Sequence, residues 1–183
     1  MNRKHGPWTV TETKTVYENP WIKVREDKVI RPDGKPGIFG VIEQKGGVSV
    51  IPMDSEGNVY LTQEYHYAVE RITIEAISGG IDKGEDKLQA AQRELKEETG
   101  FIATNLTYLG VVDPFTSTLV SPNHMYLAEG LTKGDSEQEG TETIKVIKMP
   151  FQKALEMVTN SEITHGASCV ALLKISNLLK NNK

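Results

Sequence analysis

Three glutamates gather within one predicted helix and could hold a metal ion. Glu94 and Glu98 are four residues apart, so a helix places them on one face with Glu97 beside them. Like charges at this spacing repel one another unless a cation lies between them. Mg²⁺ takes oxygen ligands and is commonly held by one or two carboxylates together with substrate phosphates. The alternative is a solvated acidic face, which is the more common state of such charge clusters.

A glycine-rich turn and a helix must position these glutamates. Gly79 and Gly84 allow a tight bend or a close approach of the backbone to a ligand. The helix is predicted to begin near Glu85 and Asp86, whose charges suit the positive end of the helix dipole, and to end at a left-handed cap at Gly100. The apolar side of this helix, which is expected to face a core opposite the glutamates, consists of Leu88, Ala90, Ala91 and Leu95.

The whole stretch from 79 to 101 follows the pattern G-x5-E-x7-R-E-U-x-E-E-x-G-U, in which U is a bulky apolar residue. Every defined position is filled, by Gly79, Glu85, Arg93, Glu94, Leu95, Glu97, Glu98, Gly100 and Phe101. The stretch resembles the signature of the Nudix hydrolases without a departure. The resemblance implies an α/β fold, a Nudix-type α/β/α sandwich around a mixed sheet, with this box as a loop and helix on one side.

The chemistry implied is the hydrolysis of a pyrophosphate. A pyrophosphate is multiply anionic, so hydroxide attacks it slowly unless cations neutralise the phosphates and lower the pKa of a water. Mg²⁺ is the expected cofactor, with Mn²⁺ as a substitute. Glu94 and Glu98 are the expected ligands, with Glu97 as a third and the backbone carbonyl of Ser78 completing the set.

The remaining defined positions of the box have expected structural roles. Arg93 is expected to orient the metal-binding glutamates, and Glu85 to anchor the loop by hydrogen bonding. Arg93 could instead be only the i,i+4 partner of Glu97. Gly79 and Gly100 are expected to shape the two ends of the segment.

The base that activates water need not lie in the box. A base must reach the water without being a tight ligand, which suits a carboxylate on a flexible segment. The polar segment 134–142 offers Glu137, Glu139 and Glu142, and it precedes a predicted strand as the glutamate-bearing loop does in similar enzymes. Glu139 is predicted as the base and Glu142 as a further metal ligand, although a small offset would exchange these roles. The alternative is a solvated acidic loop, with Glu97 then the next candidate base.

The chain divides into a predicted N-terminal β subdomain, residues 1–45, and a predicted catalytic domain, residues 46–183. Residues 8–45 alternate apolar and polar in runs broken by Pro, Asp and Gly, which is typical of antiparallel hairpins. Strands are then predicted on both sides of the box and helices after the last strand. The predicted ranges are strands 48–53, 59–65, 72–79, 104–113, 124–131 and 143–149, and helices 151–160 and 167–179.

Beyond the box, the layout is similar to the pyrophosphatases of ADP-ribose and other nucleoside diphosphate sugars. The similarity rests on ENPWIKV, on VYLTQEY, on Glu75 ahead of the box and on THGASCVALL. It implies a homodimer through the N-terminal strands, with Trp21 holding the nucleobase and Glu75 and His66 at the substrate. His66 stands where the ADP-ribose enzymes usually have an arginine, which favours a broader preference for nucleoside diphosphate sugars.

Composition narrows the classes of partner. The net charge of −4 argues against a general nucleic-acid binder, which would present a basic face. No apolar run approaches the length of a membrane span, and the first residues lack the apolar stretch of a signal peptide, so a cytoplasmic location is expected. Two alternatives stay open: a Nudix hydrolase of nucleoside triphosphates or dinucleoside polyphosphates, and a non-catalytic nucleotide-sugar sensor. The intact set of three glutamates argues against the sensor.

Overall fold

The computed structural model describes residues 2–134 and 144–181. The chain forms two compact units, and the first of them is discontinuous in sequence. The first unit runs to Gly46 and includes Asp113–Ser121, and the second holds Gly47–Val112 and the chain from Pro122 onward. Within the described residues, no helix combines the length and the apolar character needed to cross a membrane.

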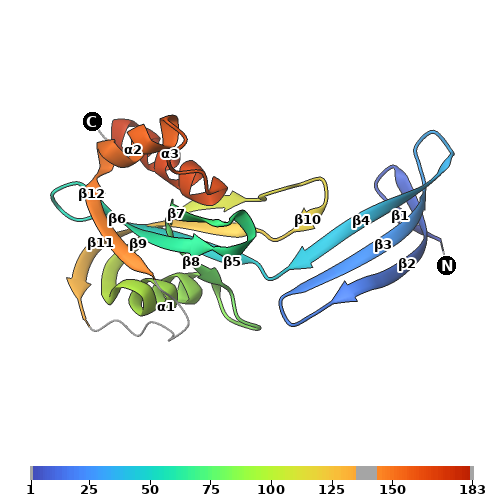
Figure 1. The fold of residues 1–183 in the computed structure, drawn as a ribbon, viewed down its shortest axis with the longest axis horizontal. Helices are drawn as coiled ribbons and strands as arrows, with labels where there is room; N and C mark the ends of the chain where they lie inside the picture. Colours follow the sequence, from blue (N-terminus) through green and yellow to red (C-terminus); the bar gives the residue numbers. More distant parts are fainter. Residues whose placement is uncertain (1, 135–143, 182–183) are drawn as a thin grey trace. The chain divides into compact units, whose positions relative to one another are not determined.

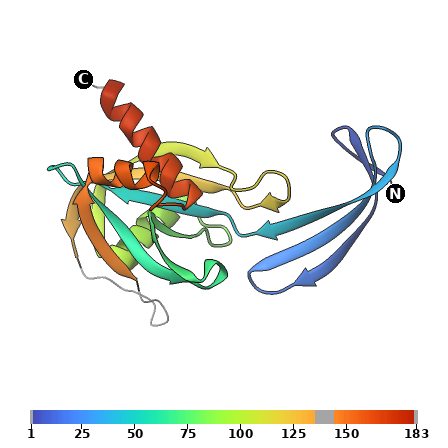
Figure 2. The ribbon, with the colours of Figure 1, turned by 45° about the horizontal axis from the view of Figure 1, so that its top comes forward.

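The first unit is built on a mostly antiparallel sheet, as the alternation of apolar and polar residues predicts. Its strands follow the order β1-β2-β3-β4-β10, and β10 lies parallel to β4 (Figure 2). The turn between β2 and β3 is closed by Asn19, whose side-chain oxygen accepts the N–H groups of Trp21 and Ile22. The strands are β1 (Arg3–His5), β2 (Trp8–Glu18), β3 (Ile22–Ile30), β4 (Pro36–Gln44) and β10 (Leu119–Val120).

The second unit contains a mixed sheet and a smaller antiparallel sheet. The mixed sheet has the order β8-β5-β11-β9, with β11 parallel to β5 and antiparallel to β9. The smaller sheet has the order β12-β6-β7. The strands are β5 (Gly47–Pro52), β6 (Asn58–His66), β7 (Arg71–Glu75), β8 (Ile77–Gly80), β9 (Phe101–Val112), β11 (Asn123–Lys133) and β12 (Lys145–Pro150), and a 3-10 helix, η1 (Tyr67–Val69), joins β6 to β7.

Helices cover the sheets of the second unit on two sides (Figure 1). Helix α1 (Lys87–Thr99) buries Ala90, Ala91 and Leu95 against Val48 and Val50 of β5. Helices α2 (Phe151–Thr159) and α3 (Gly166–Asn181) enclose the other core, which includes Ile51 of the same strand. Because β5 is covered on both faces, residues 48–52 are all buried, and all of them except Ser49 are apolar. The predicted α/β/α arrangement around a mixed sheet is therefore confirmed.

Both ends of α1 are capped, and the left-handed cap at Gly100 confirms the prediction. The expectation of acidic residues in the first turn is wrong, because the helix begins at Lys87 and Asp86 lies before it. Asp86 is the N-cap: its side chain accepts the N–H of Leu88, and Gln89 reciprocates to the N–H of Asp86. Gly100 ends the helix in the left-handed region, with φ of 73°, and donates its N–H to Lys96. The prediction that Leu88 faces the core is wrong, since 40% of its surface is exposed. Leu88 lies in the first turn, ahead of Ala90, the first residue of α1 that is buried.

Candidate functional site

The glycine-rich turn makes room for a carboxylate of α1. A Cβ built on Gly79 would lie only 1.9 Å from a carboxylate oxygen of Glu94, which is closer than any real Cβ contact. The backbone of β8 and the Glu94 side chain can therefore lie together only because position 79 has no side chain. This close approach places Glu94 against Gly79 and Ser78, which belong to strand β8, so the prediction of a turn beginning at Gly79 is wrong. The end of β8 together with the bend that follows it is here named the turn.

Glu98 lies one helical turn after Glu94 and is buried. Only 7% of its surface is exposed, and its carboxylate accepts the backbone N–H of Ser78 at 3.4 Å. The expectation that Glu98 lies on the side away from the apolar stripe is wrong. Ala91, Leu95 and Glu98 follow one another at helical spacing of four and three residues, so Glu98 continues the buried stripe. Glu94 and Glu98 thus approach the same turn from one helix.

Arg93 binds three of the four glutamates of the box. Its guanidinium donates to Glu85 at 2.9 and 3.1 Å, to Glu94 at 2.8 Å and to Glu97 at 3.0 Å. It also donates to the carbonyl of Gly80 at 2.9 Å. Hydrogen bonds to Glu85, opposed by burial and followed by those to Glu94 and Glu97, raise the pKa of the Arg93 guanidinium. Arg93 therefore does more than pair with Glu97: it joins the turn, the loop and the helix.

Glu85 closes the loop before the helix. Its carboxylate accepts the N–H of Asp82 at 2.9 Å, and its own N–H donates to the carbonyl of Asp82 at 3.0 Å. The same carboxylate accepts two hydrogen bonds from Arg93. Glu85 has a side chain that is 16% exposed, in keeping with a role in holding the loop.

The oxygen groups at this turn fit a hard divalent cation. Across residues 2–134 and 144–181, no three His, Cys, Asp or Glu side chains are arranged to hold a metal by themselves. Glu94 and Glu97 share the guanidinium of Arg93, and Glu98 faces Ser78. Two carboxylates and a backbone oxygen are nevertheless a usual protein share for Mg²⁺, whose other ligands are waters and substrate phosphates. The space that Gly79 leaves for the Glu94 carboxylate supports this assignment.

A second polar cluster surrounds Glu75. Its carboxylate lies 3.2 Å from Nε2 of His66 and 3.3 Å from Nδ1 of His165, and it accepts the hydroxyl of Thr73 at 2.6 Å. Burial lowers the pKa of His165; Glu75 opposes this shift and His66 adds to it. The structure thus brings the predicted substrate residues Glu75 and His66 together. Sequence reasoning missed His165 and Thr73, although His165 stands just before a predicted helix start.

Comparison with protein families assigns the two parts of the chain. The family model for the NUDIX domain matches residues 43–165, and the model for the nucleoside diphosphate sugar hydrolase N-terminal domain matches residues 8–42. The chain belongs to the Nudix family. As a Nudix hydrolase it is expected to use a divalent metal at the glutamates of its box.

Individual Nudix proteins resemble the chain along nearly its whole length. The methanol dehydrogenase activator of Bacillus methanolicus is 25% identical over 93% of this chain and 94% of its own length. The ADP-ribose pyrophosphatase of Bacillus subtilis (strain 168) is 26% identical over 92% and 93%. The crystal structure of an ADP compounds hydrolase is 22% identical, covers 98% of both chains and superposes with a TM-score of 0.85. This structural likeness confirms the fold.

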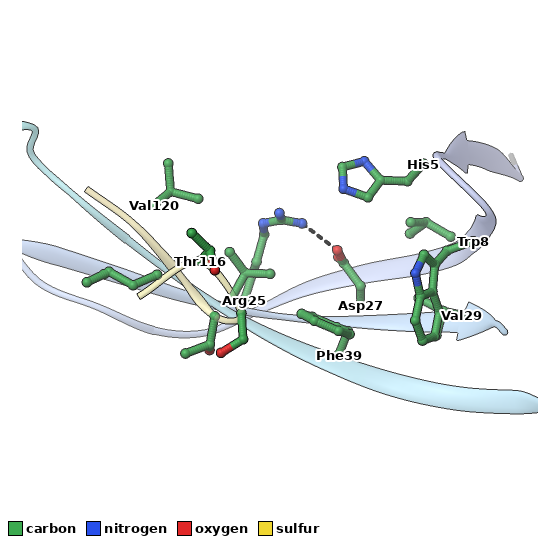
Figure 3. A pocket seen from close by; sticks show the side chains of 13 residues that line it. His5, Trp8, Arg25, Asp27, Val29, Phe39, Thr116 and Val120 are labelled. Carbon is green, nitrogen blue, oxygen red and sulfur yellow. Dashed lines mark hydrogen bonds and ion pairs between the residues drawn. The ribbon is translucent and has the colours of Figure 1, made fainter. Parts of the chain in front are cut away.

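Trp21 lies in the other compact unit of this Nudix hydrolase. Its side chain follows the turn closed by Asn19 and is 74% exposed. It does not line the cavity of about 330 Å³ within the same unit (Figure 3). In that cavity the rings of Trp8 and Phe39 meet edge to face at 5.8 Å between centroids. An exposed indole on a turn is free to pack against a planar group.

The same cavity holds a buried ion pair. Arg25 donates to Asp27 (Figure 3). The other carboxylate oxygen of Asp27 accepts the hydroxyl of Thr13 at 2.6 Å. Burial acts to raise the pKa of Asp27, but the hydrogen bonds from Thr13 and Arg25 outweigh it and leave that pKa lowered. Arg25 also donates to Glu43 at 2.8 Å. The pair is satisfied within the sheet and is not assigned a catalytic role.

The predicted base and the predicted additional metal ligand cannot be placed. Glu137, Glu139 and Glu142 lie outside the described residues. Their assignments rest on the sequence alone.

Proposed function

We propose that the chain hydrolyses the pyrophosphate bond of nucleoside diphosphate sugars, ADP-ribose among them, to a nucleoside monophosphate and a sugar phosphate, with Mg²⁺ as cofactor. The observation that carries this proposal is the packing of two glutamates of α1 against one turn, Glu94 over Gly79 and Glu98 against Ser78. The substrate class is supported by the match of residues 8–42 to the nucleoside diphosphate sugar hydrolase N-terminal domain. The names of the ADP-ribose pyrophosphatase and ADP compounds hydrolase relatives agree with it.

In this mechanism the box residues hold the cation and orient its carboxylate ligands, and the substrate supplies the reacting phosphates. Mg²⁺, when bound, supplies charge neutralisation at the phosphates and a lowered pKa of a bound water. Glu94, Glu98, Glu97 and the carbonyl of Ser78 would hold it. Arg93 keeps the carboxylate of Glu94 in one orientation, because the guanidinium is itself fixed by Glu85.

We assign the activation of water to Glu139 and a further metal ligand to Glu142, both from the polar segment 134–142. Gln substitution separates the two roles. A base loses kcat at saturating Mg²⁺, whereas the loss of a ligand is partly rescued by more metal. Full activity of the Gln variants at 137, 139 and 142 would move the role of base to Glu97.

Each unit has residues proposed to bind substrate. In the first unit Trp21 is proposed to stack on the nucleobase, and in the second unit Glu75 and His66 are proposed to contact the nucleotide sugar. We further propose a homodimer through the N-terminal strands, because β2 to β4 leave large apolar side chains exposed to solvent. These are Val16, Tyr17, Ile30, Ile38 and Phe39. A cytoplasmic location is proposed as well, and the free thiol of Cys169 is in keeping with a reducing compartment.

A substrate panel tests the proposed function. Nucleoside diphosphate sugars, nucleoside triphosphates and dinucleoside polyphosphates are incubated separately with the protein and Mg²⁺ or Mn²⁺, and the products are separated by chromatography. The proposal expects a nucleoside monophosphate and a sugar phosphate, formed fastest from the sugars. Faster turnover of triphosphates or dinucleoside polyphosphates would make those compounds the substrate class in place of the nucleoside diphosphate sugars. Binding without turnover would indicate a sensor.

A further inference from the structure

The strand that leads into the box is interrupted at Ala76. β7 ends at Glu75 and β8 begins at Ile77, so Ala76 stands between the two sheets of the second unit. Its backbone N–H donates to the side-chain oxygen of Ser168 at 2.8 Å, and both residues are buried, with 1% and 0% of their surfaces exposed. A buried N–H that lacks a strand partner must find another acceptor. Ser168, from helix α3, supplies it.

Hydroxyl groups also hold the carbonyl side of the interruption. The hydroxyl of Ser78 donates to the carbonyl of Ala76 at 2.9 Å and lies 3.0 Å from the hydroxyl of Ser49. Thr62 donates to the carbonyl of Glu75 at 3.3 Å. The backbone on both sides of Ala76 is therefore fixed by side chains, and the contact at the Ala76 N–H comes from an element more than ninety residues away, since 168 − 76 = 92.

The start of α3 fixes the orientation of Ser168. The carbonyl of His165 accepts the N–H of Cys169 at 3.0 Å, which begins the helix, and Nδ1 of His165 lies 2.8 Å from the Ser168 hydroxyl. The same nitrogen lies 3.3 Å from the carboxylate of Glu75. The first turn of α3 thus contacts both Glu75 and the N–H of Ala76.

We propose that Ser168 is a positioning residue for the metal-binding turn. This inference rests on the proposed cation site at Ser78, Glu94 and Glu98. Ser78, two residues beyond Ala76, offers its carbonyl to the cation and its N–H to Glu98. Without the Ser168 oxygen, the turn must shift until the Ala76 N–H finds another acceptor, and Ser78 moves with it. Metal affinity at the box is therefore set partly by a hydroxyl on α3 that touches neither metal nor substrate.

Metal binding measured without turnover tests the role of Ser168. Mn²⁺ is titrated into the protein by calorimetry, for the parent, Ser168→Ala and Ser168→Thr. Ser168→Ala is expected to weaken Mn²⁺ binding by about tenfold, since it leaves a buried donor without its acceptor. Ser168→Thr keeps the hydroxyl and is expected to stay within about threefold of the parent. If Ser168→Ala does not fold, Ser168→Cys, whose sulfur is a weak acceptor, takes its place.

A stability-matched control separates positioning from general destabilisation. Ala171 is fully buried on the same helix, and Ala171→Gly weakens the helix while it leaves the Ser168 hydroxyl in place. It is expected to lower the melting temperature and to bind Mn²⁺ as the parent does. The proposal is overturned if the variant without the hydroxyl binds Mn²⁺ with parental affinity. It is also overturned if Ser168→Thr or Ala171→Gly loses as much Mn²⁺ affinity as Ser168→Ala.

Glu98→Gln distinguishes a failure of the positioning role from a failure of the cation site. This variant should lose Mn²⁺ binding if the box holds the metal. Parental binding by Glu98→Gln would refute the cation site itself, whatever Ser168→Ala does. Loss in Glu98→Gln with no effect in Ser168→Ala would refute the positioning role alone.

Discussion

The side chains that are expected to act in function are paired with one another in the second unit and exposed to solvent in the first. In the second unit, the charged groups of the box are bound to one another: Arg93 alone donates to Glu85, Glu94 and Glu97. In the first unit, large side chains such as Trp21 and Ile38 are left 74% and 68% exposed. A site for chemistry must be rigid before substrate arrives, whereas a surface for recognition gains its contacts on binding. The expected metal ligands therefore lie mainly in one stretch of the chain, whereas the residues expected at the substrate are divided between the two units.

The largest expected effect lies in the box. Glu98→Gln keeps the size of the side chain and removes its charge, so turnover should fall by more than about a hundredfold. Steady-state kinetics at several Mg²⁺ concentrations measure this effect, and circular dichroism checks the fold. Gln92→Ala, at an exposed position of the same helix, is the control and should be nearly silent. Near-parental turnover by Glu98→Gln would show that the charge of Glu98 is not needed for the reaction, and the box would then not be the site of chemistry that the comparison assumes.

A smaller loss is expected from Gly79→Ala. The added Cβ would overlap the carboxylate of Glu94, and because that group ends a flexible side chain it can move aside. Turnover should fall by about ten- to a hundredfold with little loss of stability. Gly84→Ala is the counterpart: its φ of 84° strains an alanine, but no atom lies within 4 Å, so it should lower stability more than turnover. Kinetics and thermal melts of both variants give the comparison, and equal profiles would count against the Glu94 assignment.

In the first unit, Trp21→Ala should act on binding. Loss of base stacking removes interactions made equally with substrate and transition state, so KM should rise by about tenfold while kcat changes less. Kinetics with an ADP sugar and with a small-base counterpart would measure this effect. Lys35→Ala, at an exposed position in the turn between β3 and β4, is the control. A fall in kcat larger than the rise in KM would show that the first unit takes part in the chemistry.

The smallest expected effect is a pH dependence of stability from His165. Its folded-state pKa lies below the ordinary value of about 6.5, so the unfolded chain binds a proton before the folded protein does. Its contribution to stability is therefore complete above that value and is lost as the pH falls below it. Chemical denaturation from pH 8 to pH 5 should show a shallower loss in His165→Gln than in the parent. A steeper loss of unfolding free energy in the variant would contradict a lowered pKa of His165.

Local residues made the box predictable. The caps at Asp86 and Gly100 and the spacing of the glutamates are properties of one helix, and the helix formed between them. The sequence misled where a face of that helix had to be chosen. Glu98 continues the stripe of Ala91 and Leu95, so its charge suggested exposure while its position required burial.

Contacts between distant residues could not be predicted. The contact between Glu75 and His165 joins the last residue of β7 to the residue just before α3, and neither residue carries a periodic signal for the other. The hydrogen bond between Ser168 and Ala76 has the same origin. The short strands β1 and β10 were also missed, because two or three residues are too few to show an alternation.

The strand β10 makes the order of synthesis matter. β4 is synthesised early, but its parallel partner β10 is synthesised only after the whole box. The N–H of Ile42, which donates to the carbonyl of Thr118 at 2.7 Å in the folded protein, therefore lacks this acceptor at first. Until then Ile42 and Glu43 at the end of β4 lack their strand partner, and an unpaired strand edge is a site for unwanted pairing between nascent chains. A fragment ending at residue 45 would lack this pairing permanently. The first unit is thus completed by a segment that is translated after the catalytic helix.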